Sequence, residues 1–446
     1  MRRKKRRLKK KVKIILLLIL ILIPTVFLLL KNKPNNLKES KINKTNKKEI
    51  IEEVMPLVPK EITKDFLYWV KNNYGEKSII KLKEEIKGNE YNEKIWHNVT
   101  GNSYIVLNDL YNKKYDNMNN IKIINKQGTT TLGFVGDVSL ADNWYIMPKY
   151  DERKKGIYGI LSEDTVKVMK ENDIMVANSE FTVSDRGTKM PGKYYTFRAS
   201  PQRLPVYEEI GVDLVTLANN HVYDFGREAF YDMIDSFNQY KIPYIGAGKN
   251  KEEAKKPYYF ILNGYKIAFV NATRAEKLIL TPEATETEGG VFRCYDPTEF
   301  INVIKETKQN SDIVIALIHW GKEDSHELET VQKDTSKLYI DAGADVIVGS
   351  HAHVLQGIEF YKEKPIIYNL GDFIFNNETK DTGIFQIKME ENGNMEYYFI
   401  PAYESGEYTK LLYDKEKERV IKEMNAWSIN AEIDKDGKIN NKESID

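Results

Sequence analysis

The sequence predicts an α/β protein in which short buried strands alternate with helices. Five apolar runs of strand length, rich in β-branched residues, lie between Thr131 and Gly349. Helical patterns separate them, for example at 165–172, 227–240 and 331–342. This alternation is typical of βαβ units with much parallel pairing. A third observation concerns function, because each run stops at a residue type that binds metal ions.

The first thirty residues predict a membrane anchor. Residues 1–13 hold ten Lys or Arg and no acid, and Ile14–Leu30 follows as seventeen uncharged, almost wholly apolar residues. A spanning helix needs about 17–25 such residues, whereas the apolar part of a signal peptide usually has about 7–15. Basic residues favour the cytoplasmic side of a membrane, so residues 1–13 are expected there and the main body outside the cell. A cleaved signal peptide is the alternative, and it also places the body outside the cytosol.

The segment that follows divides into a stalk and a helical region. Residues 31–48 are rich in Lys and Asn, which is typical of a flexible stalk. Residues 49–128 carry helical patterning, with apolar pairs such as Ile50 and Val54 four positions apart. We expect a small helical, membrane-proximal region there, without a catalytic cluster.

The main domain is expected at 129–402, followed by a C-terminal helix and tail at 403–446. Near its end, the runs 383–388 and 395–400 flank Asn392-Gly393, which predicts a β-hairpin with a turn at Asn-Gly. The pattern at 414–427 predicts a closing helix, and the last dozen residues are polar, so we expect them to be frayed.

Composition excludes several classes of function. Outside residues 1–13, the chain has 57 basic and 66 acidic residues, a net charge of −9, so the body lacks the basic character of a nucleic-acid-binding protein. Cys294 is the only cysteine. An intrachain disulfide, a thiolate zinc site and an iron–sulfur cluster are therefore excluded, since each needs several cysteines.

Polar residues follow all five predicted strands. In open α/β sheets, ligands gather beyond the carboxyl ends of the strands, so these residues should converge on one site. The runs end in the following segments: Gly136-Asp137, Asn178-Ser179-Glu180, Asn219-Asn220-His221, His319-Trp320-Gly321 and Ser350-His351-Ala352-His353.

The histidines give the strongest signal as a set. One His-x-His pair such as His351 and His353 is weak evidence, because surface histidines are common. However, His221 and His319 also follow apolar runs, so four of the six histidines in the chain share this position. Imidazole suits zinc, iron, manganese and nickel, and carboxylates favour harder ions. We therefore expect a centre of two divalent ions (Mn, Fe or Zn), which can hold a phosphoryl group and activate a water molecule.

Basic residues near these segments suggest an anionic ligand. Arg186, Lys193 and Arg198 follow the second strand end, and an arginine can bind a carboxylate or phosphate with two parallel hydrogen bonds. Asn219 is assigned either to a turn or to a substrate contact. The alternative for the basic residues is a loop held by salt bridges.

Together these blocks resemble bacterial poly-γ-glutamate capsule-biosynthesis proteins of the CapA type, in the calcineurin-like metallophosphatase superfamily. The resemblance runs from about Thr131 to Phe375 and depends on the joint presence and order of the segments. They are the strand ends given above together with Asp224-Phe225-Gly226, Lys322-Glu323 and Tyr368-Asn369-Leu370-Gly371-Asp372-Phe373. It implies a four-layer α/β/β/α sandwich with two mixed sheets.

The resemblance also implies roles for single residues. It implies that Asp137 and His353 bind the first metal and that Glu180 bridges both metals. The second metal would be bound by Asn220, His319 and His351. His221 would donate a proton to a leaving group.

Three positions depart from the pattern. Ser139 stands where the superfamily has a histidine ligand, and Glu180 replaces a bridging aspartate. Asp372 stands where the capsule branch usually has asparagine. The first two departures argue against an ordinary phosphatase.

Three functions compete at this point. The first is an exported, membrane-anchored protein that acts on an anionic polymer such as poly-γ-glutamate, alongside membrane proteins of capsule synthesis. The second is a metal-dependent surface phosphoesterase. The third is a non-catalytic scaffold that binds the polymer, although the retained Asn220-His221 pair argues against a vestigial site.

Overall fold

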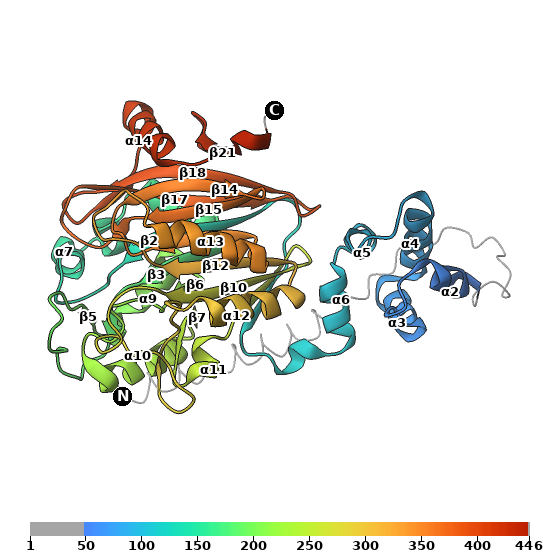
Figure 1. Ribbon diagram of the computed structural model, residues 1–446, viewed down its shortest axis with the longest axis horizontal. Helices are drawn as coiled ribbons and strands as arrows, with labels where there is room; N and C mark the ends of the chain where they lie inside the picture. Colours follow the sequence, from blue (N-terminus) through green and yellow to red (C-terminus); the bar gives the residue numbers. More distant parts are fainter. Residues whose placement is uncertain (1–48, 445–446) are drawn as a thin grey trace, which may run out of the picture. The chain divides into compact units, whose positions relative to one another are not determined.

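The computed structural model describes residues 49–444 (Figure 1). The predicted basic tail, anchor and stalk at residues 1–48 lie outside the described residues, so those three predictions are not tested. Within 49–444, no helix is both long and apolar enough to cross a membrane. The compact unit of residues 53–446 contains the sheets and the candidate site described below.

Two large mixed sheets form the centre of this unit, as the family resemblance implies. One has ten strands and holds three of the five predicted strands, and the other has seven and holds two. In spatial order the first contains β20 (Ala431–Ile433), β21 (Lys438–Asn441), β18 (Met395–Glu404), β17 (Lys380–Met389), β2 (Thr130–Val138), β3 (Ile174–Ser179), β6 (Leu214–Thr216) and β7 (Tyr244–Ile245), with β16 (Asp372–Ile374) on β2 and β19 (Thr409–Leu411) on β18. The second contains β1 (Ile121–Ile124), β9 (Tyr258–Leu262), β10 (Tyr265–Thr273), β12 (Ile313–His319), β13 (Val346–Ser350), β15 (Lys364–Leu370) and β14 (Leu355–Tyr361).

Most of the helices lie on the outer faces of the sheets or in the N-terminal region. Two two-stranded sheets complete the set: β8 (Ala247–Gly248) pairs with β11 (Gly290–Val291), and β4 (Thr182–Val183) with β5 (Arg198–Ala199). The α-helices are α2 (Glu49–Val54), α3 (Lys64–Tyr74), α4 (Glu76–Gly88), α5 (Lys94–Thr100), α6 (Tyr104–Tyr111), α7 (Ile146–Arg153), α8 (Glu163–Glu171), α9 (Pro205–Ile210), α10 (Gly226–Tyr240), α11 (Lys251–Ala254), α12 (Thr298–Gln309), α13 (Thr330–Ala342) and α14 (Asp414–Trp427).

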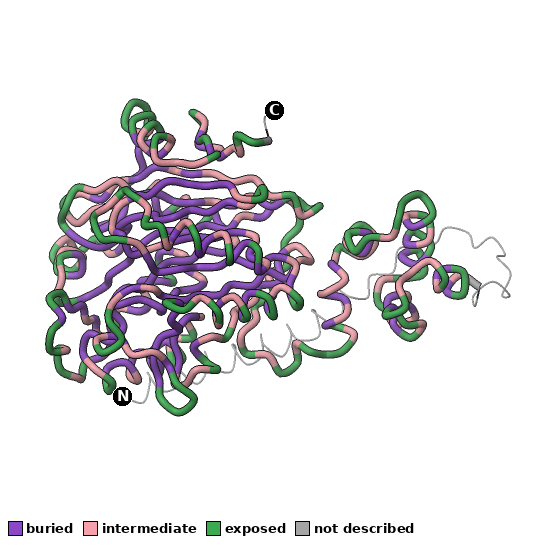
Figure 2. The backbone as a smooth tube through the Cα atoms, in the orientation of Figure 1, coloured by how far each residue is buried: buried purple, intermediate pink, exposed green. Residues whose placement is uncertain are grey.

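Three hydrophobic clusters separate four layers, and Figure 2 shows the buried strands at the centre. The middle cluster lies between the sheets and includes Phe134 of β2 and Phe269 of β10. A second cluster joins the ten-stranded sheet to α8, α9 and α10, for example through Phe230. A third joins the seven-stranded sheet to α12 and α13, through Phe300 and Tyr339. The order is therefore α/β/β/α.

Strand alternation fixes which residues face the space between the sheets. In β12, Ile313, Ile315 and Leu317 belong to the middle cluster, while the intervening residues face α12 and α13. Since successive side chains point to opposite faces, His319 continues the row that faces the other sheet. Asn178 continues the corresponding row of β3, after Ile174 and Val176.

A β-bulge in β2 directs the Asp137 side chain into the space between the two sheets. Phe134 pairs with Val176 and Asp137 with Asn178, so β2 has one residue more than β3 over this interval. The extra residue reverses the alternation. Without it, Asp137 would share the outward face of Val135, which packs toward the helices. Gly136 permits the bulge, because a Cβ there would lie 1.9 Å from the Gly371 carbonyl oxygen.

The secondary structure differs from the expectation near the ends of two predicted segments. The region predicted as helical at 49–128 contains α2 to α6, but its end forms β1, which pairs with β9 as an edge strand. The hairpin of β17 and β18 and the closing helix α14 are confirmed. The expected frayed tail is wrong for most of its length: β21 pairs with β18 and with β20, so residues beyond 402 complete the ten-stranded sheet.

Candidate metal centre

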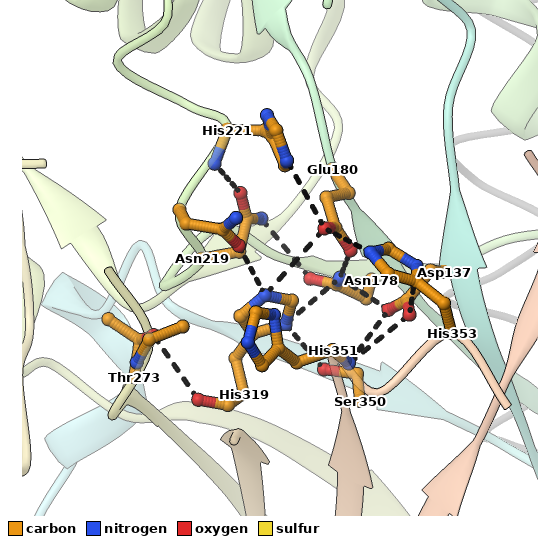
Figure 3. Close-up of polar contacts among 12 residues, drawn as sticks. Asp137, Asn178, Glu180, Asn219, His221, Thr273, His319, Ser350, His351 and His353 are labelled. Atoms are coloured by element: carbon orange, nitrogen blue, oxygen red, sulfur yellow. Dashed lines mark hydrogen bonds and ion pairs between the residues drawn. The ribbon is translucent and has the colours of Figure 1, made fainter. Parts of the chain in front are cut away.

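The ends of β2, β3, β12 and β13 meet where the two sheets face each other (Figure 3). β2 and β3 belong to one sheet, and β12 and β13 to the other. The polar residues after these strands lie together, and β6 adds the Asn219–His221 turn. The convergence predicted from the strand ends is therefore present in the structure, at the seam between two sheets.

One group of candidate ligands consists of Asp137, His353 and Asp372, which offer ligand atoms within 4.8 Å of one another. His353 Nδ1 lies 2.7 Å from Asp372 Oδ1 and 3.5 Å from Asp137 Oδ2. Asp372 is brought to this position by β16, where it pairs with Asp137 across the β2–β16 ladder. Asn376 Nδ2 donates to Asp372 Oδ2 at 2.7 Å.

A second group consists of Glu180, His319 and His351, which satisfy the same distance criterion and are all buried. His319 Nε2 lies 3.8 Å from Glu180 Oε1 and 2.7 Å from the Asn220 side-chain oxygen. Asn220 thus joins this group, as the resemblance implies. Asn178 connects the two groups, because its Nδ2 donates to Asp137 Oδ1 and to Glu180 Oε2, each at 2.8 Å.

Glu180 Oε1 tests whether these residues fit a metal ion. This buried oxygen has no hydrogen-bond partner among the described residues. It nevertheless lies 3.8–3.9 Å from the Nε2 atoms of His221, His319 and His353. Buried His351 Nδ1 also lacks a partner within residues 49–444. A buried polar atom without a partner is costly, and a cation beside these atoms would remove the cost. The donor set of carboxylate, amide and imidazole therefore fits divalent ions.

Burial and mutual repulsion control the charges of the centre. Burial raises the pKa of both Asp137 and Glu180. The neighbouring carboxylates of Asp137 and Asp372 raise the pKa of Glu180 further, whereas His353 offsets part of the rise at Asp137. Burial likewise lowers the pKa of His319 strongly and that of His351 to about 3, so both imidazoles stay neutral. Burial also opposes protonation of His353, but Asp372 and Asp137 outweigh it and raise that pKa to about 9. Neutral imidazoles are the form that binds metal.

The backbone at the His-x-His segment is strained. His351 has φ 98° and His353 φ 58°, values that non-glycine residues rarely adopt. This conformation directs the His351 backbone N–H toward Asp137 Oδ2, at 3.2 Å, while both rings face the centre. Such strain costs about 1–3 kcal/mol per residue and is concentrated at functional sites.

His221 is held in one orientation from two sides. Its Nδ1–H donates to Asp224 Oδ2 at 2.8 Å, and its backbone N–H donates to Asn219 Oδ1 at 3.0 Å. Its Nε2 is therefore left facing Glu180 Oε1, at 3.9 Å. This is where a group that donates or accepts a proton at the centre would have to lie.

The predicted substrate contacts need correction. Lys193 is buried, and its ammonium group donates to Asp224 Oδ1 at 2.6 Å and to the Asn220 carbonyl oxygen. It is a structural counter-ion and is not available to a substrate. Asn219 is also wholly buried, and its amide bonds to Asn178 and to the Ser179 carbonyl, so it supports the turn.

The two arginines are more exposed. Arg186 forms ion pairs with Asp232 and Glu228, which matches the salt-bridged loop left open by the sequence. The Arg198 guanidinium lies 4.3 Å from the centre of the Phe225 ring. Neither contact tests a role in substrate binding, which stays a prediction for both.

Asp372, Asn178 and Asp224 are the site residues that the sequence reasoning missed. The sequence distinguishes Asp372 only as a departure from the family pattern, although it follows a strand-like run as the other candidate ligands do. Asn178 and Asp224 carry no separate signal, since a single amide or carboxylate after a strand is usually part of a turn. Ser139, at the position of the absent histidine, is buried, and its hydroxyl has no partner in the described part of the chain.

Comparison with protein families gives one match. The model described as "Bacterial capsule synthesis protein PGA_cap" matches residues 131–377, more than half of the chain. This range contains both groups of candidate ligands.

Two relatives extend the comparison. The chain is 29% identical over 267 residues to "Capsule biosynthesis protein CapA" of Bacillus anthracis, which covers 57% of this chain and 64% of that protein. It is 30% identical over 276 residues to "PGA biosynthesis protein CapA" of Bacillus subtilis, which covers 60% of this chain and 70% of that protein. The matched part is thus just under two thirds of the length of the first relative.

Among solved structures, Haemophilus influenzae NAD nucleotidase is 14% identical with a TM-score of 0.37, over 68% of this chain and 64% of that one. The 5'-nucleotidase of Candida albicans is 10% identical with a TM-score of 0.33, over 62% and 51% of the two chains.

Proposed function

Because this chain belongs to the bacterial capsule synthesis protein PGA_cap family, we propose that it acts in the biosynthesis or export of an anionic polymer such as poly-γ-glutamate, through a two-metal centre. The observation that carries the proposal is the buried Glu180 Oε1, which lacks a partner among residues 49–444 and lies within 4 Å of three histidine nitrogens. The names of the two CapA relatives support the capsule role.

In this proposal, each group of candidate ligands binds one ion. Asp137, His353 and Asp372 would hold the first ion, and His319, His351 and Asn220 the second, with Glu180 between them. Asp372 would take the place of the ligand lost at Ser139. Two bound divalent ions would act as Lewis acids on a substrate oxygen and lower the pKa of a coordinated water.

The chain's own residues would then orient the substrate and move a proton. His221 would transfer that proton at Nε2, since its Nδ1 is occupied by Asp224. The Asn219 amide fixes the turn that carries His221 and Asn220, so both side chains are oriented before a substrate binds. Asp137, Glu180 and Asp372 are fully buried, so water is excluded from the carboxylates of the proposed centre.

Location is part of the proposal. Residues 1–13 and 14–30 have the charge and apolar length of a cytoplasmic tail and a single membrane span. The proposed arrangement has the main domain outside the cell, where a capsule polymer is assembled. Membrane proteins that synthesise the polymer are the proposed partners.

A metal-dependent surface phosphoesterase is the second candidate. The His221–Asp224 pair favours it, because an imidazole held by a carboxylate suits proton donation to a leaving group. Ser139 and Glu180, which depart from the superfamily pattern, argue against it. A polymer-binding scaffold without catalysis is the third candidate.

Measured metal content distinguishes the non-catalytic scaffold from the two metal-dependent candidates, the capsule protein and the phosphoesterase. We would purify the full-length protein in detergent from cells supplied with manganese, iron and zinc, and measure bound metal by elemental analysis. We expect about two ions per chain, and loss of the second in His319→Ala with His351→Ala. His97→Ala is the control, because His97 stacks on Tyr265 away from the centre. A wild-type protein without bound metal would favour the scaffold.

Activity separates the remaining two. We expect weak or no release of product from aryl phosphates, and binding or cleavage of poly-γ-glutamate. Robust turnover of aryl phosphates that is lost in His221→Ala would instead establish the phosphoesterase.

A further inference from the structure

The turn that follows β16 fixes the side chain of Asp372, a candidate ligand of the first ion. Asn376 Nδ2 donates to Asp372 Oδ2 at 2.7 Å, and the Lys380 ammonium nitrogen lies 3.6 Å from the same oxygen. A carboxylate oxygen accepts more than one bond, so Asn376 leaves room on Asp372 for an ion. Hydrogen bonds of this kind orient the ligands of a metal ion and strengthen its binding.

The turn itself is held by Glu404, the last residue of β18. Glu404 Oε1 accepts from the Phe375 N–H at 2.7 Å and from the Asn376 N–H at 3.1 Å. The Phe375 ring lies 4.8 Å from the ring of His353, measured between ring centres. One carboxyl group therefore fixes the backbone of two residues, and each of them contacts a different candidate ligand of the first ion.

Glu404 occupies a position at which packing alone would favour an apolar residue. It is fully buried, and it follows Ile400 and Ala402 on the face of β18 that packs against an apolar cluster. Its Oε2 is buried and has no hydrogen-bond partner among residues 49–444. Burial raises the pKa of Glu404 well above its usual value, and Asp372 raises it further, which favours the neutral acid. A buried carboxyl group is costly, so its contact with the turn needs a separate explanation.

The family resemblance gives Glu404 no role. The family model matches residues 131–377 and ends before β17 and β18. These two strands bring the later part of the chain back to the centre, because β17 pairs with β2, the strand that carries Asp137. Lys380 and Glu404 are opposite partners in the β17–β18 ladder, so the ends of the hairpin strands lie beside Asp372.

We propose that Glu404 is a positioning residue of the first metal site, which holds the turn of Phe375 and Asn376 and thereby orients Asp372 and His353 toward the ion. Glu404 acts through this turn and is not itself a ligand. The inference rests on the proposed two-metal centre and deepens it, because binding of the first ion then depends on a hairpin outside the part of the chain that the family model matches.

Manganese binding tests this inference. The full-length protein in detergent is stripped with EDTA, dialysed and titrated with Mn²⁺, and electron paramagnetic resonance follows the free and bound ion. The wild type should bind about two ions, with the signal of a magnetically coupled pair. Glu404→Met keeps the side-chain length and removes the strong acceptor. We expect one ion to bind at least about tenfold more weakly, as for loss of other outer hydrogen bonds, with an isolated-ion signal when only the tighter site is filled.

Three variants separate positioning from general destabilisation. Glu404→Gln should bind both ions as the wild type does, because its amide oxygen still accepts from both N–H groups. Asn376→Leu leaves Glu404 in place and should weaken the same ion. Combined with Glu404→Met, it should weaken binding by much less than the product of the single effects, because both changes act on one contact. Glu359→Met is the control, since Glu359 is 4% exposed and accepts from the Tyr368 hydroxyl at 2.6 Å. It should melt earlier than the wild type and keep both ions.

Unchanged manganese affinity in Glu404→Met or in Asn376→Leu would overturn the inference. It would also fail if Glu404→Gln binds as weakly as Glu404→Met, or if Glu359→Met weakens the same ion equally. The wild type distinguishes the two proposals. Two bound ions with unchanged affinity in the variants defeat only this inference, whereas a wild type that binds no manganese, iron or zinc defeats the proposed function as well.

Discussion

Replacement of Lys193 by methionine should destabilise the protein strongly, although it removes no candidate metal ligand. The Lys193 ammonium and the Asp224 carboxylate form a pair whose side chains are 1% and 0% exposed. Lys193→Met keeps most of the side-chain volume and removes the cation. Asp224 would then be a buried carboxylate without its strongest partner.

Loss of one member of a buried ion pair costs about 3–5 kcal/mol. We expect the lower end, about 3 kcal/mol, because Asp224 keeps two donors, His221 Nδ1–H at 2.8 Å and the Phe197 N–H at 2.7 Å. For the unit of residues 53–446, the entropy of unfolding is about 0.8 kcal/mol/K. The melting temperature should therefore fall by about 4 °C.

Thermal unfolding followed by circular dichroism measures this change, with metal present and with metal removed by EDTA. Lys189→Met is the matched control, since Lys189 is exposed on the same loop, and its melting temperature should stay within about 1 °C of the wild type. Combining Lys193→Met with Asp224→Asn removes the unpaired charge and should recover about half of the loss.

Two results would refute the reasoning. If Lys193→Met melts with the wild type, Asp224 does not need its cation, and the buried pair contributes nothing. If the double variant melts well below Lys193→Met, the loss comes from packing and not from an uncompensated charge.

The centre itself offers three further tests. In EDTA, we expect the free energy of unfolding to fall by up to about 3 kcal/mol as pH rises from 7 to 10. The pKa of His353 is about 9 in the folded state and lower in the unfolded chain, so the stabilisation by protonated His353 is complete below about pH 6.5 and is lost as pH rises through 9. An equal fall in Asp372→Asn would show that another group is responsible. Gly136→Ala should lower the melting temperature and the amount of bound metal, because the added Cβ would lie 1.9 Å from the Gly371 carbonyl oxygen. Gly88→Ala is the control, since a Cβ there meets nothing within 4 Å and should change neither quantity. Normal metal content in Gly136→Ala would contradict the role of the bulge. His319→Ala alone should leave about one ion per chain by elemental analysis, and retention of two would mean that the second group is not a metal site.

The sequence predicts most of the fold because long periodic segments dominate it. The runs within β2, β3, β12 and β13 are mostly apolar before their polar ends, as buried strands between two covered faces require. The hairpin of β17 and β18 was identified by its Asn-Gly turn. The tail was mispredicted, because the short polar strands β20 and β21 acquire order only by pairing with β18.

The site was predicted less completely, for a physical reason. Residues that directly follow an apolar run can be identified from the sequence, and Asp137, His319 and His351 are of this kind. Charge alone does not tell whether a basic residue is free, and Lys193 illustrates this, because its partner Asp224 lies 31 residues away in sequence. The bulge at Gly136 also has no sequence signal beyond a glycine, yet it decides which face Asp137 occupies.

Because the candidate ligands at the seam come from both sheets, the order of chain synthesis limits when the proposed centre could bind metal. The first donor is Asp137 and the last Asp372, so a nascent chain lacks a complete centre until most of it has emerged. Contacts of such long sequence separation form late in folding. The proposed centre would then bind metal only when synthesis and folding of the chain are nearly complete. Chains arrested before β16 should lack the first ion.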